Sequence, residues 1–204
     1  MGGIIALVGC PAVGKSFLAD KLSNSLDCRL IRELPEKGLP LDIMNNLSEQ
    51  KNLFDTIVYF RNLQVLNYKH ALSFAANNKY VVLDTPFYQN QLYVDLYVKD
   101  KAKASILRQL GEIDFLTYPQ PDCTVYIKSS ADEMLNFLHS RQSKNTWEDE
   151  SWYEFITKMV PLADDYMKSI IKRIPNLILI QRQDYDFAKP EHVNEVISKI
   201  KKMI

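Results

Sequence analysis

The stretch GCPAVGKS at residues 9–16 matches the pattern G-x-x-x-x-G-K-[ST] at every constrained position. The short apolar run before it, residues 4–8, predicts a buried strand, and residues 16–26 after it predict a helix. Glycines let backbone N–H groups curl around phosphate oxygens, and the helix behind the loop points the positive end of its dipole at them. Strand, motif and helix together indicate a Walker A phosphate loop and therefore triphosphate binding.

The residues of this loop have separate expected tasks. The lysine, Lys15, is expected to reach the β- and γ-phosphates, and the hydroxyl group of Ser16 is expected to ligate Mg²⁺. In a loop without nucleotide we expect the Lys15 side chain to be exposed. The residues predicted to contact the nucleotide are Gly9, Ala12, Val13, Gly14, Lys15 and Ser16.

Length and composition narrow the class of protein. A chain of 204 residues suits a single domain, residues 1–204, with one buried core. Its 25 basic and 25 acidic residues balance, which favours a small-molecule substrate and argues against a nucleic-acid partner without excluding one. The three cysteines lack a C-x-x-C spacing, which suits a reducing compartment. No apolar run approaches the roughly 18 residues of a membrane span. We therefore expect a cytoplasmic protein without membrane contact, and a homodimer is left open.

Short apolar segments alternate with helical ones along the chain. The alternation predicts a three-layer α/β/α P-loop fold with a five-stranded parallel sheet. Polar residues 141–150 predict a short lid. Strands are expected at 4–8, 28–34, 80–84, 123–127 and 176–180. Further helices are expected at 41–77, 87–116, 131–142, 151–174 and 191–203. The helix at 87–116 is expected to have breaks, and Ser129 or Ser130 is expected to cap the helix at 131–142. Pro161 is expected to kink or split the helix at 151–174.

Two polar residues, Glu33 and Asp84, fall near the carboxyl ends of expected strands, where such sheets bind ligands, and a third candidate, Arg141, lies at the end of an expected helix. Asp84 ends the third strand and is expected to hold Mg²⁺ through water, unless it is only a solvated strand-end carboxylate. Glu33 is the candidate base for a substrate hydroxyl proton, and its alternative is a salt bridge with Arg29 or Arg32. Arg141, where the lid begins, is expected to close over the transferring phosphate, unless it merely caps a helix.

The long helical segment after the second strand mixes rings with planar polar groups. Aromatic rings stack on bases and glutamine amides pair with base edges, so a nucleoside pocket is expected there. Its candidate residues are Tyr59, Arg61 and Gln64. Phe87 and Tyr88, shortly after the third strand, are further candidates. For every one of these rings, the alternative is a place in the core at helical spacing.

Taken together, these residues resemble the nucleoside and nucleoside-monophosphate kinases of the P-loop superfamily. The resemblance spans nearly the whole chain, from the phosphate loop through Glu33, Gln64 and Asp84 to YPQPDCTVYI at residues 118–127. That last segment is similar to the Pro-Asp-leading strand of deoxynucleoside and thymidylate kinases, in which an arginine-bearing lid follows, as Arg141 does here. The resemblance implies ATP and Mg²⁺ as cofactors and transfer of the γ-phosphate to a nucleoside or nucleotide.

One motif departs from this family. Deoxynucleoside kinases carry Glu-Arg-Ser and thymidylate kinases Asp-Arg-Tyr where this chain has Asp84-Thr85-Pro86. The missing arginine normally touches substrate or phosphate, and Asp-Thr followed by an aromatic residue also resembles ribosylnicotinamide kinases. We expect a nucleoside acceptor, a deoxynucleoside before its monophosphate, because the sequence offers no second basic cluster. The alternatives are a nucleoside-monophosphate kinase, a modified-base or DNA kinase, and a nucleotide-binding regulator with slow hydrolysis.

Overall fold

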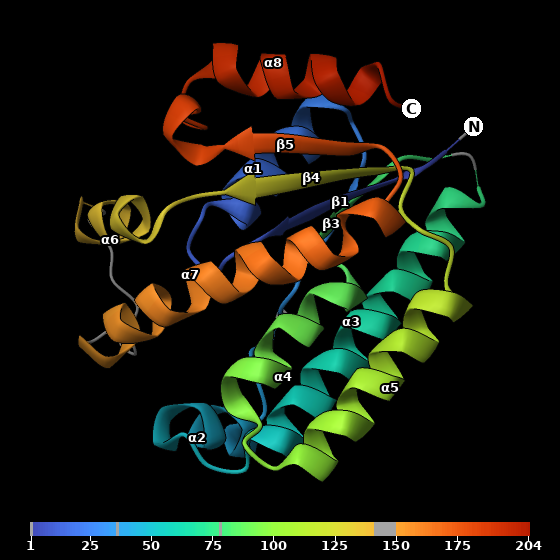
Figure 1. Cartoon of the computed structure of the whole chain (residues 1–204). Coiled ribbons are helices and arrows are strands. Elements are labelled where there is room, and N and C mark those ends of the chain that lie inside the picture. Colours follow the sequence, from blue (N-terminus) through green and yellow to red (C-terminus); the bar gives the residue numbers. More distant parts are fainter. Residues whose placement is uncertain (1, 36, 78, 141–149) are drawn as a thin grey trace.

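The computed structural model describes residues 2–35, 37–77, 79–140 and 150–204, which contain one sheet of five parallel strands (Figure 1). β1 lies in the middle of the sheet between β3 and β4, so the phosphate loop that follows β1 starts at the centre of the sheet edge. In spatial order the strands are β2 (Arg29–Ile31), β3 (Val81–Asp84), β1 (Ile4–Gly9), β4 (Cys123–Lys128) and β5 (Leu177–Gln181).

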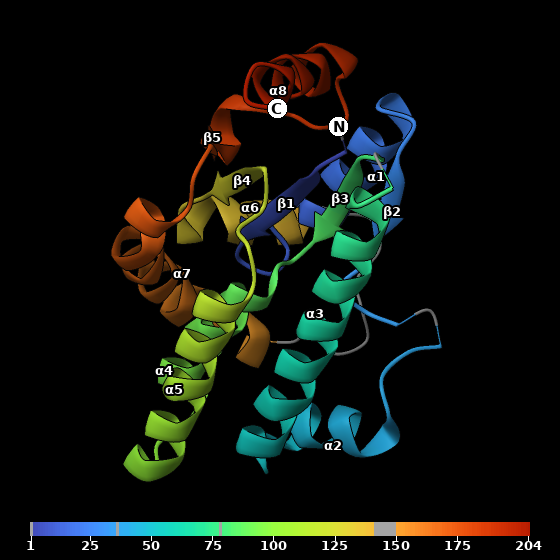
Figure 2. The same ribbon diagram turned by 90° about the vertical axis from the view of Figure 1, so that its right-hand side faces the viewer.

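Helices cover both faces of the sheet and complete three layers, which Figure 2 shows from the side. Parallel strands buried in this way consist of short, almost wholly apolar runs, as the sequence has them. One face is covered by α1 (Lys15–Ser25) and α8 (Pro190–Lys201), and the other by α3 (Leu53–Ala75) and α7 (Glu150–Ile170).

Two apolar cores lie on opposite sides of the sheet. Successive side chains of a strand point to opposite faces. In β1, Ile5 and Leu7 therefore pack with the residues of α1 and α8, whereas Ile4 and Val8 pack with those of α3 and α7. This division fixes the register of the strand, and the register in turn fixes where the phosphate loop begins.

The remaining elements build the walls beyond the carboxyl edge of the sheet. α4 and α5 run beside α3 (Figures 1 and 2), and α6 packs against α7. The described helices lack the combination of length and apolar character that a membrane span requires. The bounds are α2 (Leu41–Glu49), α4 (Gln91–Tyr97), α5 (Lys101–Thr117) and α6 (Ala131–Ser140), with 3₁₀ turns η1 (Phe87–Asn90), η2 (Ile171–Arg173) and η3 (Arg182–Asp184).

The predicted α/β/α fold with a five-stranded parallel sheet is confirmed. Two boundaries differ from the prediction. The second strand has three residues instead of seven, and the helix expected over 41–77 is interrupted. Gln50 and Asn52, with φ of 51° and 47°, adopt left-handed conformations between α2 and α3. A left-handed residue ends a helix, and asparagine tolerates this conformation better than most residues.

Pro161 is predicted either to kink or to split this helix, and the split does not occur, because α7 runs through this residue without a break. A proline costs one backbone hydrogen bond and some steric strain. Around it, Met159, Val160 and Ala163 bury an apolar face against α6 and the phosphate loop, and this packing stabilises the helix.

Ser130 is one of the two predicted caps of α6. Its hydroxyl group accepts a hydrogen bond from the backbone N–H of Glu133 at 3.2 Å, and its own backbone N–H donates to the Glu133 carboxylate at 2.8 Å. Of the predicted lid, residues 141–149 lie outside the described residues.

Candidate active site at the carboxyl edge of the sheet

The phosphate loop leaves the end of β1 and turns directly into α1. Gly9 lies so close to β4 that a Cβ there would stand 2.6 Å from the carbonyl oxygen of Ile127. Ala12 and Gly14 have φ of 64° and 101°, left-handed values that glycine adopts without strain. The two glycines of the motif therefore occupy the positions where a side chain would clash or strain the backbone.

Lys15 is folded back over the loop rather than exposed, contrary to the sequence-based expectation. Its side chain is 6% exposed, and Nζ donates to the carbonyl oxygens of Gly9 at 3.0 Å and Cys10 at 3.1 Å. The ammonium group thus lies over the loop, where two backbone carbonyl oxygens take the place of phosphate oxygens. Ser16, next in the chain, is exposed in the first turn of α1.

Arg182 binds the backbone of the phosphate loop through its side chain. It follows β5, and its Nε donates to the carbonyl oxygen of Val13 at 3.2 Å. Its guanidinium group lies 4.8 Å from the ring centre of Phe187 and 5.3 Å from that of Phe137. Sequence analysis missed this residue, because its partner lies 169 positions earlier in the chain.

Asp84 ends β3 next to the phosphate loop, as the strand order predicts. It pairs in register with Leu7, two residues before the loop begins. The side chain is 2% exposed, and within the described residues Oδ1 has no hydrogen-bond partner. A buried carboxylate oxygen without a partner is costly in an unliganded protein, so this atom is placed for a ligand.

Glu33 lies beyond the end of β2 and faces the same edge. Gln64 on α3 donates to its carboxylate, with Nε2 3.4 Å from Oε1. Burial raises the pKa of the Glu33 carboxyl above its usual 4.5, and the charge of Asp84 raises it as well. The charge of Lys15 and the hydrogen bond from Gln64 oppose the shift. The net rise makes Glu33 a better proton acceptor than an ordinary surface glutamate.

The alternative for Glu33, a salt bridge with Arg29 or Arg32, is not found among the described residues. Arg32 pairs instead with Asp20, with Nη2 2.6 Å from Oδ1. The guanidinium group of Arg29 lies over the ring of Phe74, 4.7 Å from its centre. Glu33 therefore belongs with the phosphate loop and not with the basic surface of β2.

The three candidate site residues on α3 contact different parts of the protein. Gln64 is 1% exposed, and its Oε1 has no hydrogen-bond partner among the described residues. Arg61 points to α5, where its Nε donates to Asp114 at 2.7 Å, so it links two helices and does not lie beside Gln64 in the pocket. Tyr59 is partly buried and packs edge-to-face with Phe60, with the ring centres 5.5 Å apart. Of the three, only Gln64 contacts Glu33.

Phe87 and Tyr88 lie in the core between the sheet, α3 and α7. The ring of Phe87 packs edge-to-face on Tyr68 at 4.9 Å, and the hydroxyl group of Tyr88 shares a hydrogen bond with Thr124 at 3.1 Å. Their placement follows the core alternative, and we leave them out of the site. Arg141, predicted to close over the phosphate, lies outside the described residues.

Two polar residues that sequence analysis missed complete the arrangement. Gln89 on η1 accepts a hydrogen bond from the backbone N–H of Gly9 at 3.1 Å. Tyr93 lies next to Gln89, Glu33 and Cys10, and burial raises its pKa well above 10, so the phenol stays protonated. Both follow the third strand at the ligand-binding edge, and that position was the only signal in the sequence.

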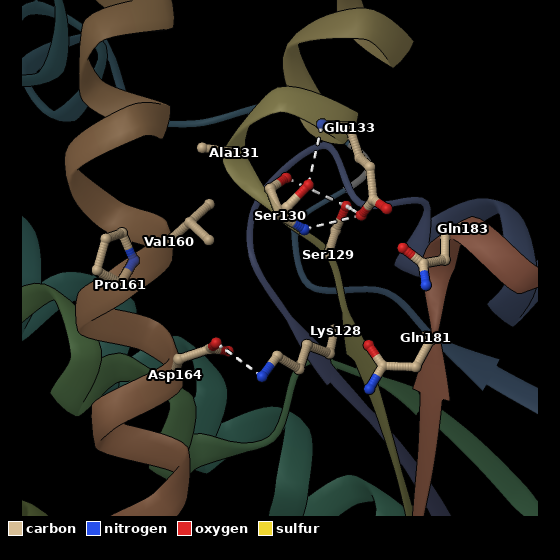
Figure 3. A pocket seen from close by; sticks show the side chains of 10 residues that line it. All are labelled: Lys128, Ser129, Ser130, Ala131, Glu133, Val160, Pro161, Asp164, Gln181 and Gln183. Atoms are coloured by element: carbon tan, nitrogen blue, oxygen red, sulfur yellow. Dashed lines mark hydrogen bonds and ion pairs between the residues drawn. The ribbon is translucent and has the colours of Figure 1, made fainter.

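A separate pocket of about 400 Å³ opens between α7 and the carboxyl ends of β4 and β5 (Figure 3). It contains none of the catalytic, nucleotide-binding or substrate-binding residues predicted from the sequence. Its charged side chains are bound within its own wall: Lys128 pairs with Asp164 at 2.9 Å, and Glu133 accepts from the hydroxyl group of Ser129 at 2.9 Å. These satisfied groups give the pocket no evident reactive centre.

No protein-family model and no curated protein sequence matches the chain. Solved structures do match it over nearly its whole length, and the match shows the fold of P-loop kinases.

Two of these structures are deoxyadenosine kinases from M. mycoides. The one with the products dCMP and dCDP has a TM-score of 0.73 and 15% identity, and the match covers 98% of this chain and 99% of that chain. The one with bound dATP has a TM-score of 0.73 and 17% identity, covering 97% and 98%. A third structure, NadR protein in complex with NR, has a TM-score of 0.65 and 14% identity, and the match covers 99% of this chain but 50% of that chain.

Proposed function

We propose that this protein is an ATP-dependent kinase that transfers the γ-phosphoryl group to a hydroxyl group of a nucleoside. The observation that carries the proposal is Glu33, whose carboxyl group has a raised pKa and lies between Lys15 of the phosphate loop and the buried amide of Gln64. A protein that only binds nucleotide needs no proton acceptor at this place. Phosphoryl transfer to a hydroxyl group does, because the acceptor oxygen must lose its proton as it bonds to phosphorus.

In the proposed reaction, Glu33 accepts the hydroxyl proton while the acceptor oxygen bonds to the γ-phosphorus and the bond to the leaving ADP oxygen breaks. Lys15 exchanges the carbonyl oxygens of Gly9 and Cys10 for phosphate oxygens and stabilises their charge. The lysine lies close enough to Glu33 to lower its pKa, so the two groups are within electrostatic reach of one reacting centre.

Asp84 and Ser16 are the residues that would hold Mg²⁺. The ion, when bound with ATP, neutralises charge on the phosphate oxygens. The fit rests on the buried Oδ1 of Asp84, which lacks a protein partner among the described residues, and on oxygen ligands being those that Mg²⁺ prefers. Within those residues, no cluster of three His, Cys, Asp or Glu side chains could hold a metal alone. An ion bound jointly by one carboxylate, one hydroxyl and the nucleotide is consistent with this.

A nucleoside fits the pocket better than a nucleoside monophosphate. An acceptor phosphate needs a basic partner, and the arginines of the neighbouring elements have other partners in the described part of the chain. Arg61 binds Asp114, Arg32 binds Asp20, and Arg29 lies over an aromatic ring. The unpartnered Oε1 of Gln64 offers a hydrogen-bond acceptor to a base edge or to a carboxamide.

A second acceptor class, ribosylnicotinamide, is favoured by one feature. The unpartnered Oε1 of Gln64 can accept a hydrogen bond from the carboxamide of a nicotinamide ring. The structural match to NadR protein in complex with NR supports including this substrate in the tests.

The proposal is tested by measuring ADP release with Mg²⁺ and ATP, alone and with a panel of deoxynucleosides, ribonucleosides, ribosylnicotinamide, nucleoside monophosphates and an oligonucleotide. A nucleoside kinase releases ADP only in step with a phosphorylated nucleoside. Equal ADP release with and without every acceptor would instead indicate a nucleotide-binding regulator with slow hydrolysis. A response to the oligonucleotide alone would indicate the DNA kinase.

A further inference from the structure

The side-chain amide of Gln89 contacts the phosphate loop through its oxygen atom. The side chain is 2% exposed, and its Oε1 accepts the backbone N–H of Gly9 at 3.1 Å. Because a backbone N–H can only donate, the oxygen of the amide must face Gly9, and this contact fixes the orientation of the whole group. Its Nε2 must therefore face away from the loop.

That Nε2 is buried and makes no hydrogen bond to any described residue. Tyr93 on α4 is a close neighbour of both Gln89 and Glu33. The amide therefore lies between the first residue of the phosphate loop and the surroundings of the candidate base. Buried amide donors are nearly always hydrogen-bonded in native proteins, so a free one at this place indicates a ligand.

We propose that Gln89 is a substrate-binding residue whose Nε2 donates a hydrogen bond to a sugar oxygen of the acceptor while its Oε1 holds Gly9. This inference rests on the proposed function. It assigns a neutral hydrogen-bond donor to the position between the phosphate loop and Glu33.

The sugar is the part of the acceptor that this donor can reach. The oxygen and nitrogen of one amide are only about 2 Å apart, so Nε2 lies close to the loop backbone at Gly9. The reacting hydroxyl oxygen must come within about 3 to 3.5 Å of the phosphorus, which brings the sugar to the loop and leaves the base farther away. A donor at the loop therefore meets a sugar oxygen.

Two substitutions of Gln89 distinguish the role of the amide oxygen from the role of the amide nitrogen. Gln89→Glu keeps an oxygen for Gly9 and loses the donor, but adds a charge. Gln89→Met adds no charge and loses both the acceptor oxygen and the donor nitrogen. A defect shared by the two variants therefore reports the loss of the donor. The matched control is Gln120→Met: Gln120 also has a buried Oε1 without a partner in the described structure, but it lies in the loop before β4.

We expect the acceptor KM to rise at least tenfold in both Gln89 variants, equivalent to about 1.4 kcal/mol. Binding of a non-hydrolysable ATP analogue, measured by calorimetry, should weaken in both Gln89 variants by less than the acceptor KM rises, because Gln89→Glu adds a negative charge beside the phosphate loop and Gln89→Met leaves Gly9 without its partner. Gln120→Met should match the wild type in both measurements. Thermal unfolding shows whether each variant is folded. If one Gln89 variant fails to fold, the acceptor KM of the other variant is the deciding measurement.

The outcomes separate this inference from the proposed function. Wild-type protein that phosphorylates no nucleoside overturns the proposed function and this inference with it. Wild-type protein that is active, together with an acceptor KM within twofold in either folded Gln89 variant, overturns the role of Gln89 alone. An equal KM increase in Gln120→Met also overturns it, because the effect would then be general to buried glutamines.

Discussion

Replacing Glu33 by glutamine keeps the shape of the side chain and removes its ability to accept a proton. The variant amide can still receive the hydrogen bond from Gln64 that the carboxylate receives at 3.4 Å. General-base catalysis contributes about 10²- to 10⁴-fold to a rate. At 1.36 kcal/mol per factor of ten, the variant should therefore lose about 2.7 to 5.4 kcal/mol of transition-state stabilisation, seen as a fall in kcat with the nucleoside KM changed little.

The same substitution should not destabilise the unliganded protein at neutral pH. Because the folded-state pKa of Glu33 is raised, the stability of the wild type falls as the pH rises from the usual 4.5 to the folded-state pKa and levels off above it; below 4.5 both states are protonated and the penalty vanishes. Glutamine lacks this penalty. The unfolding temperature of Glu33→Gln relative to wild type should thus rise as the pH increases from about 4 to 8.

The assay combines steady-state kinetics with thermal unfolding over this pH range. The wild-type acid limb of kcat/KM for the acceptor should have an apparent pKa above 4.5, and the variant should lose this limb. A variant with kcat within threefold of wild type, or with a lower unfolding temperature at pH 8, would refute the reasoning. Glu33 would then be a structural residue that stabilises the region as an ion.

Three further substitutions test the rest of the site. Lys15→Met should lower kcat by about 100- to 1000-fold and cost some stability because the carbonyls of Gly9 and Cys10 lose their donor; turnover within threefold of wild type would contradict this. Asp84→Asn should shift the Mg²⁺ dependence of activity to higher concentration, and an unchanged titration curve would leave Asp84 a structural residue. Gln64→Ala should weaken nucleoside binding by about 1 to 3 kcal/mol in calorimetry with ATP affinity unchanged, and equal nucleoside affinity would remove Gln64 from the pocket.

The sequence predicted the parts of the site that depend on strand ends. Asp84 could be placed beside the phosphate loop because an apolar run ending in a carboxylate predicts both a buried strand and the edge at which it ends. The same reasoning brought Glu33 to that edge although β2 is shorter than expected. Such predictions succeed because parallel strands of one sheet all end on the same side.

The side-chain directions could not be predicted in the same way. Phe87 and Tyr88 follow a strand end, as a ligand-binding residue does, but their rings turn into the core between α3 and α7. Arg61 shares a helix with Gln64, yet it points to Asp114, 53 positions away in sequence. Local spacing gives the position of a residue on its helix, whereas the partner on another element decides what the side chain contacts.

Polar atoms without partners in the described structure show a pattern that the sequence could not reveal. Five described residues leave one buried oxygen or nitrogen without a hydrogen bond. Gln120 lies in the loop before β4, whereas the other four lie around Glu33 and the phosphate loop; they are Asp84, Thr85, Gln64 and Gln89. Each such atom costs about 1 to 3 kcal/mol relative to a satisfied one. If these residues served stability alone, apolar side chains of similar size would serve better. Their placement around one carboxyl group with a raised pKa is what a pocket requires when its ligand supplies the missing partners, and a bound acceptor and nucleotide should therefore raise the unfolding temperature together more than either does alone.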